Sequence, residues 1–499
     1  MFSGLFSFKG GIKPEAHKAE SVTLPIAAVP LPKYLHIPLH QNVGGPPRPL
    51  VKVGDRVLKG QAIGASDAFV SAAVHASSSG LVRAIAPFPA AHPSGLKTLC
   101  VEIETDGEDR WINRQPLDYL NLPPEQVRAH LQNFGVVGMG GAVFPSHAKT
   151  EASCTVPMET LVINGAECEP YITCDDRLMR ERTPEILQGA GILRDLLRPR
   201  RVLVGVEDNK PEAIAALKAT LETLGPRFSE FQIVPVPTRY PAGGAKQLIR
   251  VLTGHEIAAG QRATSRGVQC FNVATAYFAW RAIAHGEPVV SRVVTVTGNV
   301  RTPQNYEALI GMPMEALLAL AEPKANTHEL IMGGPMMGFS VPNAQAPVVK
   351  ATNCLIAGSP DLFPPKPLEM PCIRCGACAE ACPHELQPFE LYWYARAKNF
   401  KKVQDYALDD CIECGCCAYV CPSRIPLVQY FRFAKGEIWA QKQEQQASEA
   451  AKARFEFKQF REEREKQEKA ERLAKAAAAQ AAKKALAEGE TQSAIQPQE

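Results

Sequence analysis

The chain has 499 residues, a net charge of +3 and an apolar fraction of 45%. Its length predicts two to four domains, and its mild charge argues against binding to nucleic acid or to an anionic membrane surface. No apolar run is long enough to span a bilayer, and the N-terminal stretch lacks the architecture of a signal peptide. We therefore expect a cytosolic chain, in which fifteen cysteines indicate metal or redox chemistry rather than disulfides.

Residues 1–115 are expected to form a β-rich domain. The segment LVKVGDRVLKGQAIG alternates apolar and polar residues around turn formers, and VHASSSGLVRAI is typical of a strand, a turn and a second strand. The pair resembles the barrel-sandwich, or hammerhead, half of biotinyl and lipoyl carrier domains. Those domains carry their cofactor on a lysine at a hairpin tip, but no lysine occurs between Lys59 and Lys97. We therefore predict a structural module rather than a mobile carrier arm.

Residues 120–285 alternate strand and helix patterns, as in TLVING, TPEILQGAGILRDLL and RVLVGVE. Such alternation predicts a parallel, doubly wound α/β sheet, which binds its ligands at the carboxyl ends of the strands. Residues 286–345 return to strands and a short helix, and a proline-rich linker follows. The sequence therefore predicts a multidomain α/β protein.

The region 365–435 contains two cysteine runs of one spacing, CIRCGACAEACP from Cys372 and CIECGCCAYVCP from Cys411. Three thiolates at this spacing reach three irons of one cubane cluster, and the fourth, before proline, ligates the other cluster in bacterial two-cluster ferredoxins. Zinc would require paired cysteines, which fits poorly. We predict two [4Fe–4S] clusters, held by Cys372, Cys375, Cys378 and Cys421 and by Cys411, Cys414, Cys417 and Cys382. Cys416 lies outside this spacing and is expected to be a free thiol.

The segment 437–499 is rich in alanine and in charged residues, and has neither proline nor glycine between Glu437 and Glu488. Helix propensity is high there, but apolar residues become sparse after Phe460. We expect a solvated helix or a disordered tail, with a docking helix as the alternative.

Three further segments are candidates for a ligand site. The loop GVVGMGGAVFPSHAK brings glycine amides near a possible phosphate, VINGAECEPYITCDD places acids at a strand's carboxyl end, and RYPAGGAKQL puts two glycines before a helix. The first two segments have a structural alternative, a glycine-rich turn and an acidic surface loop, and the third is unremarkable by itself. No segment is diagnostic by itself.

In this order, however, GMGGAVFP, NGAECEP and FNVAT resemble the motifs of the NADH-binding flavoprotein subunit of respiratory complex I and of related hydrogenase diaphorases. The resemblance implies FMN and NAD(H) binding in a central α/β domain. By matching positions it places Glu167 against the flavin and Glu169 against the nicotinamide nucleotide as catalytic acids. It assigns cofactor binding to Gly138, Gly140, Gly141, Ala142, Phe144, Lys149, Asn164, Tyr240, Gly243, Asn272 and Thr275.

The sequence departs from those motifs at several positions. Met139 replaces an arginine, Val143 a glycine and Ala166 an aspartate, while Gly244 and Ala245 stand where that family has two glutamates. These departures leave the nucleotide contacts open.

Over nearly its full length, the chain resembles the C subunit of the Rnf (Rsx) ion-translocating electron-transport complex, since VTGNVRTP indicates a β-grasp-like segment of the SLBB type and the start GGIKPEAHK also fits. The resemblance implies a ferredoxin:NAD oxidoreductase subunit, peripheral on the cytoplasmic side of the inner membrane, with membrane and ferredoxin-like partner subunits and no nucleic acid. Electrons would pass between NAD(H), FMN and the two clusters. The alternatives are a soluble diaphorase subunit and a flavin-free iron–sulfur adaptor.

Overall fold

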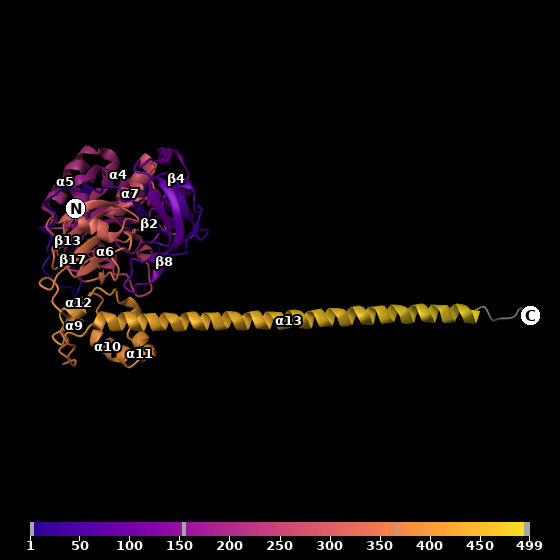
Figure 1. Ribbon diagram of the computed structural model, residues 1–499. Coiled ribbons are helices and arrows are strands. Elements are labelled where there is room, and N and C mark those ends of the chain that lie inside the picture. The colour runs from indigo at the N-terminus through magenta and orange to yellow at the C-terminus, as the bar shows by residue number, and fades with distance from the viewer. Residues whose placement is uncertain (1–3, 152–155, 366, 494–499) are drawn as a thin grey trace, which may run out of the picture.

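The computed structural model describes residues 4–151, 156–365 and 367–493, which form a body, a cysteine-rich module and one long helix (Figure 1). A single hydrophobic core runs through three parts of the body, a β-rich domain, an α/β domain and a mixed sheet, and it includes Leu35, Ile163 and Val294. The cysteine-rich module has its own core and packs against one end of the body.

The β-rich domain consists of two antiparallel sheets, as the barrel-sandwich prediction requires. Its larger sheet has the order β2 (Tyr34–Pro38), β8 (Lys97–Thr105), β7 (Gly80–Pro89) and β4 (Arg56–Val57). The smaller sheet has the order β3 (Arg48–Pro49), β5 (Ala62–Ala65) and β6 (Val74–His75). Alternation along β2 buries Leu35 and Ile37, so one face of the larger sheet closes onto the core.

The α/β domain contains a parallel sheet with the order β11 (Phe231–Val236), β10 (Arg201–Glu207), β9 (Thr160–Gly165) and β12 (Val268–Asn272). On one face, Ile163 and Val204 belong to the core that includes α4 (Thr183–Leu197) and α7 (Val273–His285). On the other face, Val162 and Leu203 pack with α6 (Ala245–Thr253). Both faces are therefore covered, which confirms the doubly wound α/β prediction.

The remaining helices are α1 (Pro124–Asn133), α2 (Ser146–Glu151), α3 (Cys174–Glu181) and α5 (Pro211–Thr223), with short 3-10 turns η1 (Tyr119–Asn121), η3 (Pro226–Phe228) and η4 (Ala263–Arg266).

The mixed sheet draws its strands from distant parts of the chain. Its order is β1 (Ala27–Ala28), β14 (Gln304–Leu309), β13 (Ser291–Gly298), β17 (Cys354–Gly358), β15 (Glu329–Met332) and β16 (Phe339–Ser340), and α8 (Met314–Ala319) follows β14. β17 lies beyond the predicted segment 286–345 but occupies a central place. β1 belongs to the N-terminal arm, residues 4–28, which precedes the β-rich domain and crosses the body.

The cysteine-rich module repeats one local structure twice. In each run a glycine, Gly376 or Gly415, adopts a left-handed conformation (φ 81° and 82°) and starts a short helix, α9 (Ala377–Glu380) or α12 (Cys416–Tyr419). Between the runs lie α10 (Pro388–Arg396), α11 (Phe400–Asp405) and η5 (Leu408–Asp410). The positive φ explains the glycine at the same place in both runs, because other residues are strained there.

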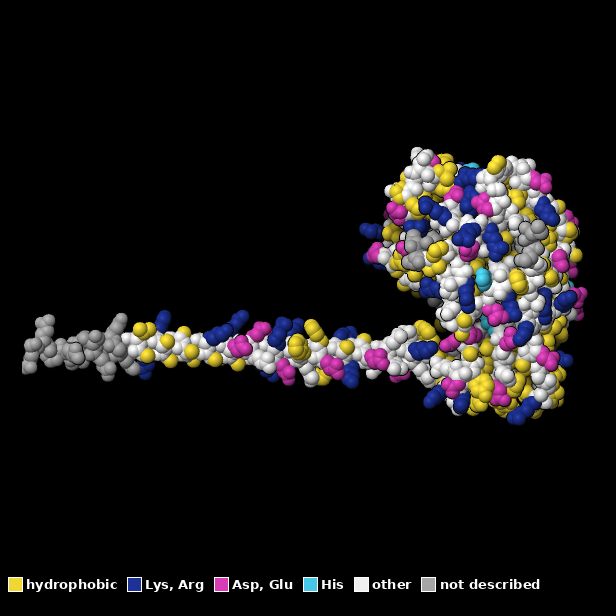
Figure 2. Space-filling view, turned by 180° about the vertical axis from the view of Figure 1, so that it is seen from behind, with side chains coloured by type: hydrophobic (Ala, Val, Ile, Leu, Met, Phe, Trp, Pro, Cys, Tyr) yellow, Lys and Arg dark blue, Asp and Glu magenta, His cyan; other side chains and the backbone are white. Residues whose placement is uncertain are grey.

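The helix α13 (Leu427–Ser493) begins inside the module and continues for 67 residues. Leu427, Phe431, Ala434 and Ile438 are buried against the module, at spacings of three and four residues. From residue 439 to 487 every side chain is exposed, and Figure 2 shows basic and acidic side chains interspersed along the rod. The segment 437–493 is thus helical, while 494–499 lie outside the described residues.

Across the described residues, no helix is both long enough and apolar enough to cross a membrane. The exposed part of α13 is instead supported by ion pairs four residues apart, such as Lys458 with Glu462 and Arg464 with Glu468. Such pairs contribute about 0.3–0.5 kcal/mol each to an isolated helix.

We expect removal of residues 445–499 to leave the iron content and the thermal unfolding midpoint of the remaining chain unchanged. From Gln445 to Leu486 the hydrogen bonds and ion pairs of the described side chains stay within the helix. Calorimetry and iron analysis of the truncated and full chains provide the measurement. A midpoint lowered by several degrees, or lost iron, would show that this helix stabilises the body.

Candidate functional site

Two cavities in the cysteine-rich module gather the cysteines of the two runs. The wall of the first includes Cys372, Cys375, Cys378 and Cys421. The wall of the second includes Cys382, Cys411, Cys414 and Cys417. Each cavity therefore combines three cysteines of one run with the fourth cysteine of the other, which is the grouping that crossed ligation requires.

The surroundings of both cavities suit iron–sulfur clusters. Apolar side chains such as Tyr392 and Ile425 in the first cavity, and Leu391 and Phe431 in the second, complete the walls. Cubane clusters are held by four thiolates, and hydrogen bonds to their sulfurs help to set the reduction potential of the cluster. Backbone amides already point at sulfur in the second cavity, since Leu386 N lies 3.4 Å from Cys382 Sγ and Glu413 N lies 3.4 Å from Cys411 Sγ.

Cys416 lines neither cavity. Its side chain is fully buried and packs with Tyr240, Ala381 and Cys414. Its place outside the spacing predicts a free thiol, and a buried thiol packed among these side chains is compatible with that prediction.

The predicted glycine-rich loop follows α1 and precedes α2. Gly138 N donates to Phe144 O at 2.8 Å, which closes the loop, and Thr275 Oγ1 accepts from Met139 N at 2.9 Å. The amides at 140, 141 and 142 have no acceptor among the described residues, and these three residues are exposed. Gly141 has a φ of 99° and open space where a Cβ would stand. The loop therefore offers a row of unpaired amides that suits a phosphate.

Two asparagines end adjacent strands beside this loop. Asn164 on β9 and Asn272 on β12 are paired in register, so they lie side by side at the carboxyl edge of the sheet. Asn164 Nδ2 donates to Gly243 O at 2.8 Å, while Asn272 caps α7 and donates to Asp175 Oδ2 at 2.6 Å. Gly140 also approaches Asn272, since a Cβ on it would lie 3.5 Å from the asparagine Cβ. The loop, both asparagines and Thr275 thus meet at the edge where parallel sheets bind ligands.

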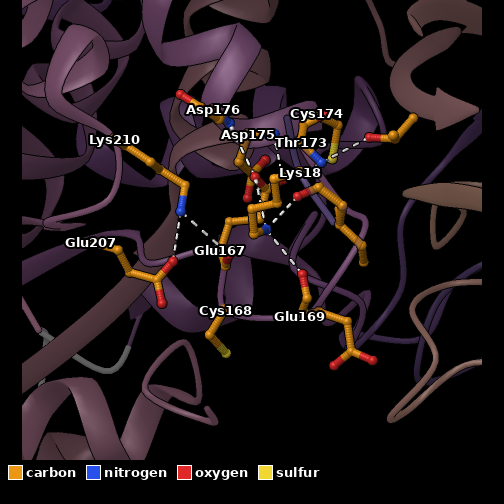
Figure 3. Close-up of polar contacts among 12 residues, drawn as sticks. Lys18, Glu167, Cys168, Glu169, Thr173, Cys174, Asp175, Asp176, Glu207 and Lys210 are labelled. Atoms are coloured by element: carbon orange, nitrogen blue, oxygen red, sulfur yellow. Dashed lines mark hydrogen bonds and ion pairs between the residues drawn. The ribbon is translucent and has the colours of Figure 1, made fainter. Parts of the chain in front are cut away.

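A network of buried charges lies next to that edge (Figure 3). Glu167 Oε1 accepts from Asp175 N at 2.8 Å at the start of α3, and its Oε2 is 3.8 Å from Lys18 Nζ. Lys18 also donates to the carbonyls of Glu169 and Ile172. Burial raises the pKa of Glu167 from 4.5 to about 8, against the opposing charge of Lys18. Burial likewise raises the pKa of Asp175.

Three predicted site residues also make contacts within the protein that the sequence does not indicate. The carboxylate of Glu169 points away from Lys18 in Figure 3 and accepts from the amides of Met336 and Met337, at 2.7 and 2.9 Å. Tyr240 donates from its hydroxyl to Cys414 O at 2.7 Å. The ammonium of Lys149 binds the carbonyl of Cys270, and burial lowers its pKa.

Sequence reasoning missed three charged residues that hold the site. Lys18 comes from the N-terminal arm, Asp175 from α3 and Arg292 from β13, where its guanidinium donates to Met139 O at 3.3 Å. Arg292 is 2% exposed, and it supplies positive charge beside the loop position where the related flavoproteins have an arginine and this chain has Met139. An arginine near the start of a strand rich in valine is the signal of this role that the sequence offers.

We expect the free energy of unfolding to depend on pH through Glu167. Its folded pKa lies above the unfolded one, so the folded state binds the proton more tightly, and stability falls as pH rises from 4.5 toward 8. Glu167→Gln should flatten this slope, because glutamine cannot ionise. Chemical unfolding at several pH values in this window is the measurement, with Glu456→Gln on exposed α13 as control. Equal slopes in both variants would assign the pH dependence to other groups.

Four family models match the chain, and together they cover most of the body and the module. They are the RnfC barrel sandwich hybrid domain over residues 6–108, the Nuo51 FMN-binding domain over 131–281, the SLBB domain over 293–340 and the 4Fe-4S dicluster domain over 371–425. The FMN-binding match contains the glycine-rich loop and both asparagines, and the dicluster match contains all eight cavity cysteines.

Curated relatives extend the match along the chain. The C subunit of the ion-translocating oxidoreductase complex of Pasteurella multocida (strain Pm70) is 50% identical over 457 residues, which are 90% of this chain and 54% of that protein. The protein of the same name from Haemophilus influenzae (strain PittEE) is 46% identical over 457 residues, which are 91% of this chain and 69% of the relative. This chain therefore spans between about half and two thirds of those relatives.

Among solved structures, an NAD⁺-reducing [NiFe]-hydrogenase in the air-oxidized state is similar, with a TM-score of 0.46 and 17% identity, over 57% of this chain and 54% of that one. The family is assigned from the sequence relatives and the matching domains. On that basis the chain belongs to the RnfC family, the C subunits of ion-translocating oxidoreductase complexes.

Proposed function

We propose that this chain is an NAD(H)-linked electron-transfer subunit with FMN in its α/β domain and two [4Fe–4S] clusters in its cysteine-rich module. The observation that carries the proposal is the direct packing of the second cysteine cavity against the loops around the carboxyl edge of the parallel sheet, through the contact of Tyr240 with Cys414. A two-electron site and a one-electron site are useful to one another only when they lie close together. The matches to FMN-binding and dicluster domains support the same pairing.

The residues at the sheet edge have complementary proposed roles. The amides of 140–142 would hold the FMN phosphate, and Asn164, Asn272 and Thr275 would fix the loops around the flavin. Lys18 holds Glu167 and the backbone before α3, so that the acid keeps one position. When bound, FMN supplies the exchange between hydride and single-electron chemistry that neither nicotinamide nor clusters provide alone.

The remaining predicted residues are proposed to line the same site from Gly138, Phe144 and Gly243, with Lys149 supporting β12. Glu169 is proposed to act on the nicotinamide side while it holds the 336–337 amides. The proposed domain limits are 1–115, 120–285, 286–345 and 365–435, with β17 completing the third part and α13 starting within the fourth.

The names of the relatives support the proposed setting. They are subunits of an ion-translocating oxidoreductase complex, and we propose that this chain joins other subunits of such a complex as a peripheral component on the cytoplasmic side of the inner membrane. NAD(H) is then the soluble partner, and electron transfer is coupled to ion movement by the membrane subunits.

The function is tested by purifying the chain without oxygen and measuring flavin, iron and NADH oxidation. We expect acid precipitation to release FMN, because no covalent attachment is evident, and NADH to reduce ferricyanide through that flavin. Iron with no flavin under any reconstitution condition would favour a flavin-free adaptor. Full activity with no association with membrane subunits would favour a soluble diaphorase.

We expect the two clusters to depend on each other's cysteine run. Cys421→Ser should damage the cluster of Cys375, and Cys382→Ser should damage the cluster of Cys414, because each fourth cysteine faces the other run's cavity. Electron paramagnetic resonance (EPR) of the variants is the measurement, after Cys375→Ser and Cys414→Ser have assigned the two signals. If Cys421→Ser instead removed the Cys414 signal and spared the other, each run would close its own cluster.

A further inference from the structure

The second cysteine cavity is fastened to the α/β domain by Tyr240. This tyrosine stands between β11 and α6, is 2% exposed, and donates its hydroxyl hydrogen to Cys414 O at 2.7 Å. Its ring packs with Ala381, Cys414 and Cys416. One buried side chain of the α/β domain thus contacts the loop that carries a predicted cluster ligand.

The N-terminal arm also reaches the surroundings of the same cavity. Gly11 N donates to Ala381 O at 2.9 Å, next to the predicted ligand Cys382. A Cβ on Gly10 would lie 2.3 Å from Cys382 O, so only glycine permits this approach, and its φ of 65° also favours glycine. The arm therefore touches the backbone of the cysteine that the first run contributes to the second cavity.

Tyr240 and the arm are joined to each other. Ile12 N donates to Tyr240 O at 2.8 Å, and Tyr240 N donates to Ile12 O at 3.0 Å. A third contact comes from the loop before β16, because a Cβ on Gly415 would lie 3.0 Å from Met336 O, and Glu169 holds the amide of that methionine. Three segments of the body thus contact the backbone next to the second cavity.

The first cavity is more remote from the body. The lining residues of both cavities belong to the module, but among the described residues no hydrogen bond or ion pair joins the wall of the first cavity to the α/β domain or the arm. Cys375 on its rim is exposed, and Ile373 beside it is 67% exposed. In the part of the chain that the structure describes, the two cavities therefore differ in one respect that the repeated cysteine spacing does not reveal. Hydrogen bonds from the α/β domain and the arm reach residues at the second cavity and not those at the first.

We propose that Gly10, Gly11 and Tyr240 form a clamp that fixes the second cluster site against the α/β domain, and that they are positioning residues for electron exchange between that cluster and the flavin. The proposal rests on the proposed function. In the exchange served by the clamp, two single-electron transfers to the clusters discharge one hydride equivalent taken from NADH, and one proton is released. The clamp takes no part in the bond changes and only sets the relative position of donor and acceptor.

The clamp is tested with Tyr240→Phe and Gly10→Ala in the complete chain, loaded with flavin and iron. Tyr240→Phe removes one hydrogen bond and no ring volume, and Gly10→Ala pushes the arm away from Cys382. Gly4→Ala is the matched control, since nothing lies within 4 Å of a Cβ at this exposed arm position. Rapid-mixing absorbance measures flavin reduction by NADH and the later cluster reduction separately. EPR gives the spectrum of each cluster.

We expect iron content to be unchanged in Tyr240→Phe. The rate of cluster reduction, taken relative to the rate of flavin reduction in the same sample, should fall severalfold, because the loop that carries Cys414 loses its hydrogen bond to the α/β domain. The spectrum of the cluster assigned to Cys414 should shift, and that of the Cys375 cluster should not. Gly10→Ala should show the same pattern more strongly, or lose only the Cys414 cluster. Rates and spectra equal to those of Gly4→Ala in both variants would overturn the clamp. An unmodified chain whose flavin is not reduced by NADH would instead overturn the proposed function.

Discussion

The reach of a C-x2-C-x2-C loop is the constraint on which the module depends. Three thiolates at this spacing can surround three corners of a cubane, but the fourth corner faces away from the loop. Each run must therefore find its fourth cysteine elsewhere, and the wall of each cavity contains the fourth cysteine of the other run. Under the proposed crossed ligation each half would need the other to complete its cluster, and both runs share one core with α10 and the first turns of α13.

The N-terminal arm has a comparable role in the body. Before it reaches the β-rich domain, it touches the module through Gly11, the buried charge network through Lys18 and the mixed sheet through β1. The arm is therefore coupled to three parts of the fold. Through Lys18, the position of Glu167 depends on the path that the arm takes across the body.

Local patterns account for what the sequence could predict. The cysteine spacing, the glycine-rich loop and the alternation of strands with helices each lie within a short window, and the corresponding structures follow. Other contacts join residues more than a hundred positions apart, as in the clamp and in the contact of Arg292 with Met139. The strand β17 likewise pairs with β13 only after a long connection. Such contacts depend on how helices and strands pack against one another once they have formed, so no local periodicity or motif predicts them. For that reason the motif match predicts that Tyr240 lies at the flavin, but it does not predict the hydrogen bond from the Tyr240 hydroxyl to the loop of Cys414.

The long exposed helix changes how the whole molecule behaves in solution. At about 1.5 Å per residue, the stretch beyond Ile438 extends roughly 80 Å, whereas a compact body of this size has a radius of gyration of about 22 Å. A particle of this shape is elongated, so it diffuses more slowly than a compact one and tumbles anisotropically. Its hydrodynamic radius therefore exceeds that of a sphere of equal mass, and an elution volume read against globular standards would overstate the number of subunits.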